Sequence, residues 1–149
     1  MTSRTTKIAV AREQLEDGVA LFLAKRYISS LALLGAAEEI LARVLEGSTG
    51  KHPLESTWAM ANNIRAKLGH PHISKTEVFR IFNAGRNAIK HHTPGETLKM
   101  SHDRFGEAFE MIQRATWCAH SLKLRYKGKK EYREWYKESG FGNPWARTK

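Results

Sequence analysis

The sequence predicts an all-α fold, a compact bundle of about five helices with a short C-terminal helix or tail. Apolar residues recur every three or four positions along most of the chain, and the alternation typical of strands is nearly absent. Glycine, proline and helix-capping residues divide this pattern into segments of helical length. A chain of 149 residues corresponds to one domain that can bury a substantial core.

The first two predicted helices cover residues 7–26 and 28–46. We expect the second to lie at the centre of the bundle, because its apolar face is wide, and to end at Gly47. The first helix turns one face to the core: Ile8, Ala11, Leu15, Val19 and Phe22. The second does so with Leu33, Leu34, Ala37, Ile40, Leu41, Val44 and Leu45. Glycines inside predicted helices indicate close packing: Gly18, Gly35 and Gly85.

The next two helices are separated by a turn that contains proline. The third is predicted over residues 53–68 and ends before Gly69. Ser74 and Glu77 then match a capping box, in which each side chain accepts a hydrogen bond from the other residue's backbone. The fourth helix follows this cap and continues to about His92.

The last predicted helices cover residues 103–125 and 130–138, and we expect the chain after Gly140 to be loose. Trp117 and Leu124 form a second apolar stripe on the fifth helix. This stripe predicts either packing by the C-terminal helix or a contact in a dimer, and the sequence favours neither. The main core stripe of the fifth helix comprises Phe105, Phe109, Ile112, Ala119 and Leu122.

The chain carries a formal net charge of +10, which favours a polyanionic partner. Residues 75–149 account for +8 of it, and the last thirty residues hold six of the fourteen aromatic side chains. We therefore divide the chain into a helical domain, residues 1–126, and a basic, aromatic-rich segment, residues 127–149, packed on that domain. Basic groups interleaved with rings suit phosphates and stacked bases, but we favour a solvated helix whose rings pack on the domain.

The sequence argues against several other classes of protein. A single cysteine, Cys118, excludes an internal disulfide, and we expect it to be a packed thiol. The seven histidines lack the helical spacing of a dedicated zinc motif, so we expect no metal and no cofactor. No apolar run is long enough to span a membrane and no signal peptide is apparent, so we expect a cytoplasmic protein.

The fourth helix carries the most informative set of polar residues. A helical wheel places a ridge opposite its apolar face, and no carboxylate occurs between Arg80 and His92. Guanidinium, amide, ammonium and imidazole groups together suit a phosphodiester, and no carboxylate pair is near to hold magnesium. The ridge comprises Arg80, Asn83, Asn87, Lys90 and His91, with Arg86 beside Asn87. The predicted core face comprises Val78, Ile81, Phe82, Gly85, Ala88, Ile89 and His92.

The stretch Arg86-Asn87-Ala88-Ile89-Lys90-His91 resembles the Arg-x4–6-His motif of the HEPN superfamily (higher eukaryote and prokaryote nucleotide-binding domains). In that motif a polar residue often follows the arginine, and the motif lies late on a helix of a small α-bundle. Residues 12–45, including Gly35-Ala-Ala-Glu-Glu-Ile-Leu41, resemble short bacterial proteins of similar layout. The resemblance covers roughly residues 7–125.

The resemblance implies a metal-independent endoribonuclease of the toxin or phage-defence type. Active members of the family dimerise, and the RNA 2′-hydroxyl attacks the adjacent phosphorus and leaves a 2′,3′-cyclic phosphate. Carried over to this chain, Arg86 would hold the phosphate and His91 would transfer protons. Asn87 would orient the His91 side chain. Further substrate contacts would come from Lys90, Asn83 and Arg80. The implied partners are RNA or a nucleotide, a second copy of the chain, and an antitoxin-like protein.

Three alternatives remain open at this stage. His92 would satisfy an Arg-x5-His spacing in place of His91, although the wheel favours His91. Glu38 and Glu39 on the second helix are candidates to bridge to Arg86 or to polarise a histidine. The chain also fits a non-catalytic helical module that binds a nucleotide, nucleic acid or a partner protein through the same ridge.

Overall fold

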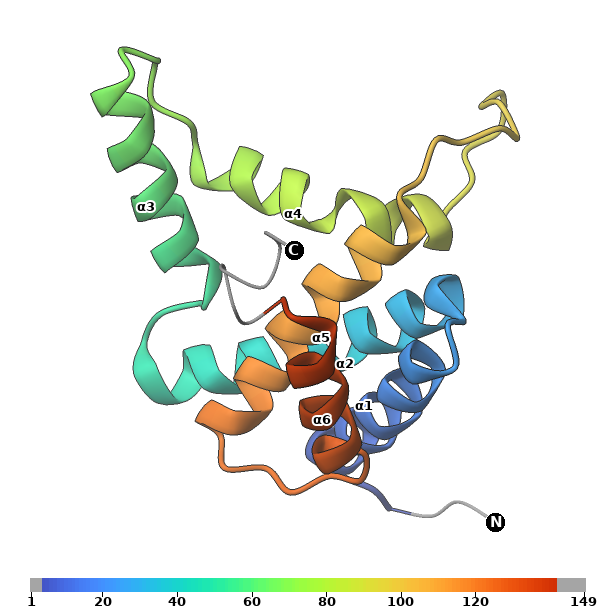
Figure 1. Ribbon diagram of the computed structural model, residues 1–149. Helices are drawn as coiled ribbons and strands as arrows, with labels where there is room; N and C mark the ends of the chain where they lie inside the picture. The colour runs from blue at the N-terminus through green and yellow to red at the C-terminus, as the bar shows by residue number, and fades with distance from the viewer. Residues whose placement is uncertain (1–3, 142–149) are drawn as a thin grey trace.

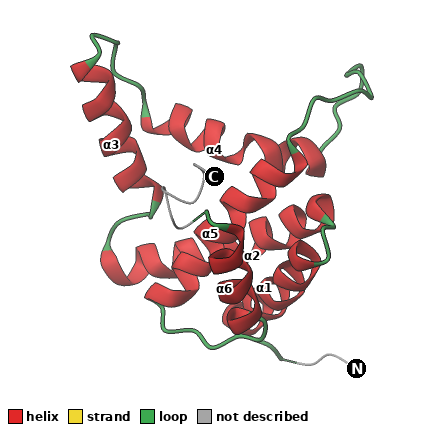
Figure 2. Ribbon diagram, in the orientation of Figure 1, coloured by secondary structure: helices red, strands yellow, loops and turns green. Residues whose placement is uncertain are grey.

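The computed structural model describes residues 4–141, and this part of the chain is all-helical, as the sequence predicts (Figures 1 and 2). No helix within it is both long enough and apolar enough to cross a membrane. The predicted loose segment after Gly140 falls almost wholly outside the described residues. The helices are α1 (Lys7–Leu23), α2 (Tyr27–Thr49), α3 (Leu54–Lys67), α4 (Lys75–Lys90), α5 (Arg104–Ser121) and α6 (Lys129–Ser139).

Helix α2 lies at the centre, as its apolar face predicts, with α1 and α5 packed along it. We call α1, α2, α5 and α6 the body (Figure 1). Gly18 lets α1 and α2 cross closely, because a Cβ there would lie 2.7 Å from the Leu34 Cγ atom. The core consists of apolar side chains that are almost wholly buried, among them Leu15, Val19, Phe22, Leu31, Leu34, Leu41, Ile112, Ala115 and Cys118.

Helix α6 covers one end of this core with aromatic rings. The Trp135 ring meets Phe22 edge to face at a centroid distance of 4.9 Å, and Tyr132 does so at 6.1 Å. Phe105 and Phe109 of α5 stack at 5.6 Å in the same cluster. The favoured interpretation of the C-terminal rings, packing on the domain, therefore holds for these α6 residues.

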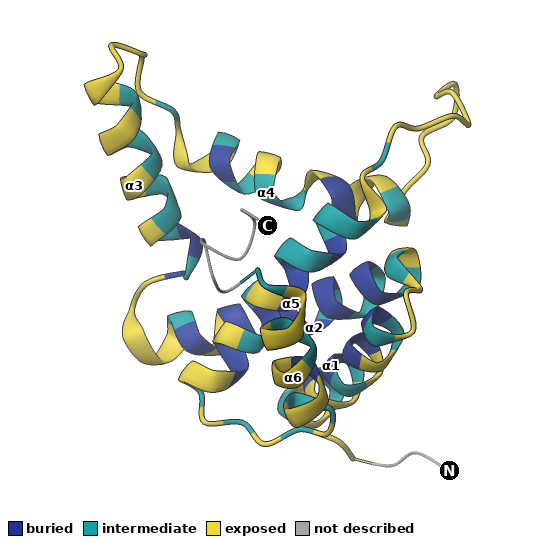
Figure 3. Ribbon diagram, in the orientation of Figure 1, coloured by how far each residue is buried: buried dark blue, intermediate teal, exposed yellow. Residues whose placement is uncertain are grey.

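Helices α3 and α4 project from the body, and we call them the arm (Figure 1). Half of the α3 residues are exposed, and Leu54 at its start is its one buried residue (Figure 3). The loop between the helices is tied back to α3, because the Trp58 indole N–H donates to the Ile73 carbonyl at 2.8 Å. Asn62 adds two further hydrogen bonds to the backbone of Ile73. The arm is therefore held together by polar contacts rather than by an apolar core of its own.

Four predicted helix ends are wrong. Helix α1 ends at Leu23 rather than at residue 26, because Lys25 (φ +59°) leaves the helical region. Helix α2 passes through Gly47 and stops at Gly50, which adopts the left-handed conformation (φ +77°) that ends many helices. Helix α4 ends at Lys90 rather than near residue 92, since the backbone of His91 is already extended. Helix α5 ends at Ser121, not at residue 125, because Lys123 (φ +54°) leaves the helical region.

The predicted core faces are partly wrong as well. On α2, Leu33 is only half-buried and Val44 is exposed, because the buried face is centred on Leu34 and Leu41. Since α4 meets the body along a narrow strip, several residues predicted to be in the core lie at the surface. These are Ile81, Ala88 and His92.

Candidate functional site

The start of α4 is fixed by half of the predicted capping box. The Ser74 hydroxyl oxygen accepts from the Glu77 backbone N–H at 3.1 Å, as expected. The Glu77 carboxylate does not return to Ser74; it accepts from the Arg80 guanidinium, whose Nε lies 2.9 Å away. Arg80 is therefore engaged in an exposed ion pair near the start of the helix.

The other end of α4 opens onto a hollow. It is bounded by the helix end, the loop of residues 93–100 and Ile28 of α2. Four of the sequence-predicted site residues line it together, and all four are exposed: Asn87, Lys90, His91 and His92. Lys99 adds a further cation to the lining and Glu96 an acid.

The two histidines lie beyond the helix, so the wheel argument that separated them is wrong. His91 has an extended backbone (φ −127°, ψ 145°), and its N–H donates to the Asn87 carbonyl at 3.2 Å. The Nδ1 atom of His92 lies 3.8 Å from the Glu96 carboxylate, which also accepts from the Thr93 N–H. Both imidazoles are therefore accessible from the hollow.

Arg86 does not lie on the solvent-facing ridge; it is buried against α2. Its side chain packs over Gly35, where a Cβ would lie only 2.4 Å from the Arg86 Cδ, so the missing side chain of Gly35 creates this seat. The Nη1 atom donates to the Gly35 carbonyl at 3.3 Å and lies 3.4 Å from Glu39. The buried Nε atom has no hydrogen-bond partner among the described residues. The guanidinium is thus held loosely and keeps hydrogen-bonding capacity.

A second polar cluster, which the sequence interpretation missed, lies where α2, α4 and α5 meet. Arg114 donates to the Glu38 carboxylate at 2.8 Å, to the Phe82 carbonyl at 2.8 Å and to the Asn83 side chain at 3.1 Å. Glu38 is only 3% exposed, although helix carboxylates are usually solvated. Asn83 is therefore turned to a structural cluster and is not among the residues that line the hollow.

One sequence signal for this cluster was available. Glu38 lies within the apolar face of α2, and Arg114 lies at the edge of the buried face of α5, three residues after Met111 and four before Cys118. A single acid and a single base on the apolar faces of neighbouring helices predict a buried ion pair. Burial also raises the pKa of the neighbouring Glu110 carboxyl, which lies 3.9 Å from Arg114.

Two further residues with reactive side chains, Cys118 and His52, are held within the fold. Cys118 is buried, as expected, and burial raises the pKa of its thiol to about 12, so it is not a thiolate nucleophile at neutral pH. The Nδ1 atom of His52 accepts from the Leu54 N–H at 3.1 Å at the start of α3. Within residues 4–141, no three side chains of the metal-ligating types His, Cys, Asp and Glu come together.

Compared with protein-family models, with curated proteins and with solved structures, the chain matches none of them. A functional assignment therefore depends on the residues and their geometry. The strongest grouping is the one at the end of α4, where polar side chains predicted from the sequence share a single hollow.

Proposed function

We propose that the protein is a metal-independent endoribonuclease of the HEPN type, acting as a toxin or in phage defence. The observation that supports this most strongly is the shared hollow of Asn87, Lys90, His91 and His92. These residues supply an amide, an ammonium group and two accessible imidazoles within one concave surface. Such a set suits binding of a phosphodiester and proton transfer at it.

The proposed reaction uses the RNA's own nucleophile. The 2′-oxygen attacks the adjacent phosphorus, the bond from phosphorus to the 5′-oxygen breaks, and a 2′,3′-cyclic phosphate remains. The His91 imidazole accepts the proton of the 2′-hydroxyl, and the departing 5′-oxygen takes up a proton. His92, the next residue along, is the candidate for this second proton transfer. The Lys90 ammonium group stabilises the negative charge that develops on the phosphate.

Arg86 takes part only if its guanidinium leaves its seat on α2. Its contacts of 3.3 and 3.4 Å are longer than the 2.7–2.9 Å typical of charged hydrogen bonds. A phosphate in the hollow would offer the guanidinium stronger, charge-assisted acceptors than these two contacts. The Glu39 carboxylate is the acidic partner that holds the guanidinium in the unliganded protein.

The inward position of Arg86 also favours one alternative, a non-catalytic binding module. Lys90 and Lys99 line the hollow without any help from Arg86 and are sufficient to attract a nucleotide phosphate. The two functions differ in their dependence on Arg86. In the ribonuclease, Arg86→Ala lowers the cleavage rate, whereas in the binding module it leaves nucleotide affinity unchanged.

The proposal includes a homodimer, for which α3 offers a surface. Met60, Ile64 and Leu68 follow one another at intervals of four residues and are 61%, 51% and 66% exposed. An apolar stripe of this kind on a projecting helix is typical of a protein interface. We expect the protein to sediment as a dimer at micromolar concentration, and Ile64→Asp to sediment as a monomer. A monomeric wild-type protein under these conditions contradicts the dimer.

The decisive experiment is incubation of the protein with mixed-sequence RNA, and with DNA of the same sequence, in excess EDTA. The proposal predicts cleavage of the RNA alone, with 2′,3′-cyclic phosphate ends, because DNA lacks the 2′-hydroxyl. Cleavage of both nucleic acids, or cleavage that EDTA abolishes, contradicts it. RNA that is bound but remains intact selects the binding module.

A further inference from the structure

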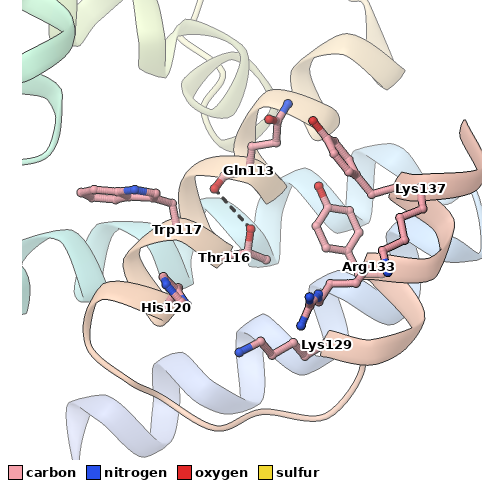
Figure 4. A pocket seen from close by; sticks show the side chains of 9 residues that line it. Gln113, Thr116, Trp117, His120, Lys129, Arg133 and Lys137 are labelled. Carbon is pink, nitrogen blue, oxygen red and sulfur yellow. Dashed lines mark hydrogen bonds between the residues drawn. The ribbon is translucent and has the colours of Figure 1, made fainter. Parts of the chain in front are cut away.

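A groove between the second half of α5 and α6 carries a strong positive charge. Trp117 and His120 of α5 line one side, and Lys129, Arg133 and Lys137 of α6 line the other (Figure 4). No carboxylate belongs to the lining. None of the three α6 cations has an ion-pair partner within the described part of the chain. The positive charge of the groove therefore attracts anions, and the groove is separate from the hollow at the end of α4.

The α6 cations form a regular row. They occur at intervals of four residues, so they lie on one face of the helix about 6 Å apart along its axis. This regular interval resembles that between successive phosphates of an extended single strand. A compact anion would occupy only one of the three positions, so the row favours a chain of phosphates.

Trp117 supplies a second and independent feature of this groove. Its side chain is 53% exposed, although most other aromatic rings of α5 and α6 pack into the core. In Figure 4 the indole extends from the α5 side of the groove and points away from α6, with His120 of the same helix beside it. An exposed indole and a row of cations that line the same groove can stack a single-stranded base and neutralise the phosphates of the same strand.

We propose that this groove binds a single-stranded segment of RNA, with phosphates along Lys129, Arg133 and Lys137 and a base stacked on Trp117. The choice of RNA rests on the proposed ribonuclease function, and the phosphate and stacking contacts follow from the groove itself. Figure 1 shows α5 running from the loop after α4 to the connection with α6. Trp117 lies about 20 Å along this helix from its start at Arg104. On this proposal the groove holds a part of the strand that lies away from the cleaved bond.

The test measures binding of a fluorescein-labelled, mixed-sequence RNA of twelve nucleotides by anisotropy, in excess EDTA. All variants carry His91→Ala, so that the probe stays intact. We expect Trp117→Ala to weaken binding about tenfold, as expected for the loss of one stacked base, and Trp117→Phe to retain most of the affinity. The matched control is Ile81→Ala, which truncates a similarly exposed apolar side chain on α4 that lines neither the groove nor the hollow.

The phosphate row is tested separately by salt dependence. Arg133→Ala with Lys137→Ala removes two phosphate contacts, so the slope of log affinity against log salt becomes shallower by about 1.4. The control pair, Lys7→Ala with Lys67→Ala, removes the same charge elsewhere and leaves the slope unchanged. Inorganic polyphosphate serves as an anion without bases, and Trp117→Ala leaves its affinity unchanged.

Two results overturn the proposal. One is an RNA affinity of Trp117→Ala equal to that of Ile81→Ala, and the other is the same salt slope for both double variants. Failure of the ribonuclease proposal is distinct, because it appears as intact RNA with the otherwise wild-type protein while the groove variants still alter binding. Failure of the groove alone appears as RNA cleavage whose KM is the same with and without Trp117→Ala.

Discussion

The body and the arm differ in how many of their residues they bury. Helices α1, α2 and α5 of the body each bury five or more residues, and α6 covers them while burying only Tyr132. Helices α3 and α4 together bury only Leu54, Val78, Gly85 and Arg86. The residues that line the hollow all lie at the end of the arm or in the loop beyond it, apart from Ile28. The contrast indicates that a packed body supplies stability, while the arm is left free to carry exposed polar groups.

Buried polar groups lie where the two regions meet. Arg86 joins α4 to α2 through Gly35, and Arg114 joins α5 to Glu38 of α2 and to the backbone of α4. His52 lies at the junction of α2 and α3, in ring contact with Phe79 at 4.7 Å. Because apolar contacts between arm and body are sparse, these groups set the position of the arm.

The largest expected difference in stability between body and arm comes from the loss of a core side chain. Leu34 is wholly buried between α1 and α2, and we expect Leu34→Ala to lower the free energy of unfolding by about 2–5 kcal/mol. Ile81→Ala on the arm, where the side chain is half exposed, changes it by no more than about 0.5 kcal/mol. Urea denaturation measures both changes in the free energy of unfolding, and equal changes would show that body and arm do not differ in stability.

The next effect concerns the junction. Arg114→Met leaves the Glu38 carboxylate buried without its partner, and we expect it to cost about 3 kcal/mol. The matched control is Arg43→Met, which removes an exposed pair with Glu46 and costs less than about 1 kcal/mol. Thermal and urea unfolding give both values. A cost for Arg114→Met no greater than that of the control would show that the cluster does not hold the arm.

The smallest effect is a dependence of stability on pH that arises at the same junction. Burial, with a further contribution from the charge of Arg43, lowers the pKa of His52 below its ordinary value of 6.5. As pH falls through 6.5, the unfolded chain therefore takes up a proton that the folded chain resists, and stability decreases. We expect His52→Asn, which keeps a hydrogen-bond acceptor but does not titrate, to lose less stability between pH 7.5 and 5. An equal loss in both proteins would exclude His52 as the cause.

The sequence predicts the helices well and their relative placement poorly. The apolar periodicity of α1 and the cap at Ser74 are local features, so they can be recognised without knowing the neighbours. The seat of Arg86 depends on the missing side chain of Gly35, fifty-one residues earlier in the chain. A helical wheel places a side chain on a face of its own helix and contains no information about what that face meets. The projection of the arm was missed for the same reason.

The central claim is that His91 at the end of the arm performs chemistry and does not support the fold. The direct measurement is the rate of RNA cleavage in excess EDTA by the wild-type protein, by His91→Ala and by His70→Ala, which removes an exposed histidine from the turn before α4. We predict a loss of at least 100-fold for His91→Ala, a rate within about twofold of wild type for His70→Ala, and the same urea midpoint for all three. Cleavage by His91→Ala at the wild-type rate would contradict the account.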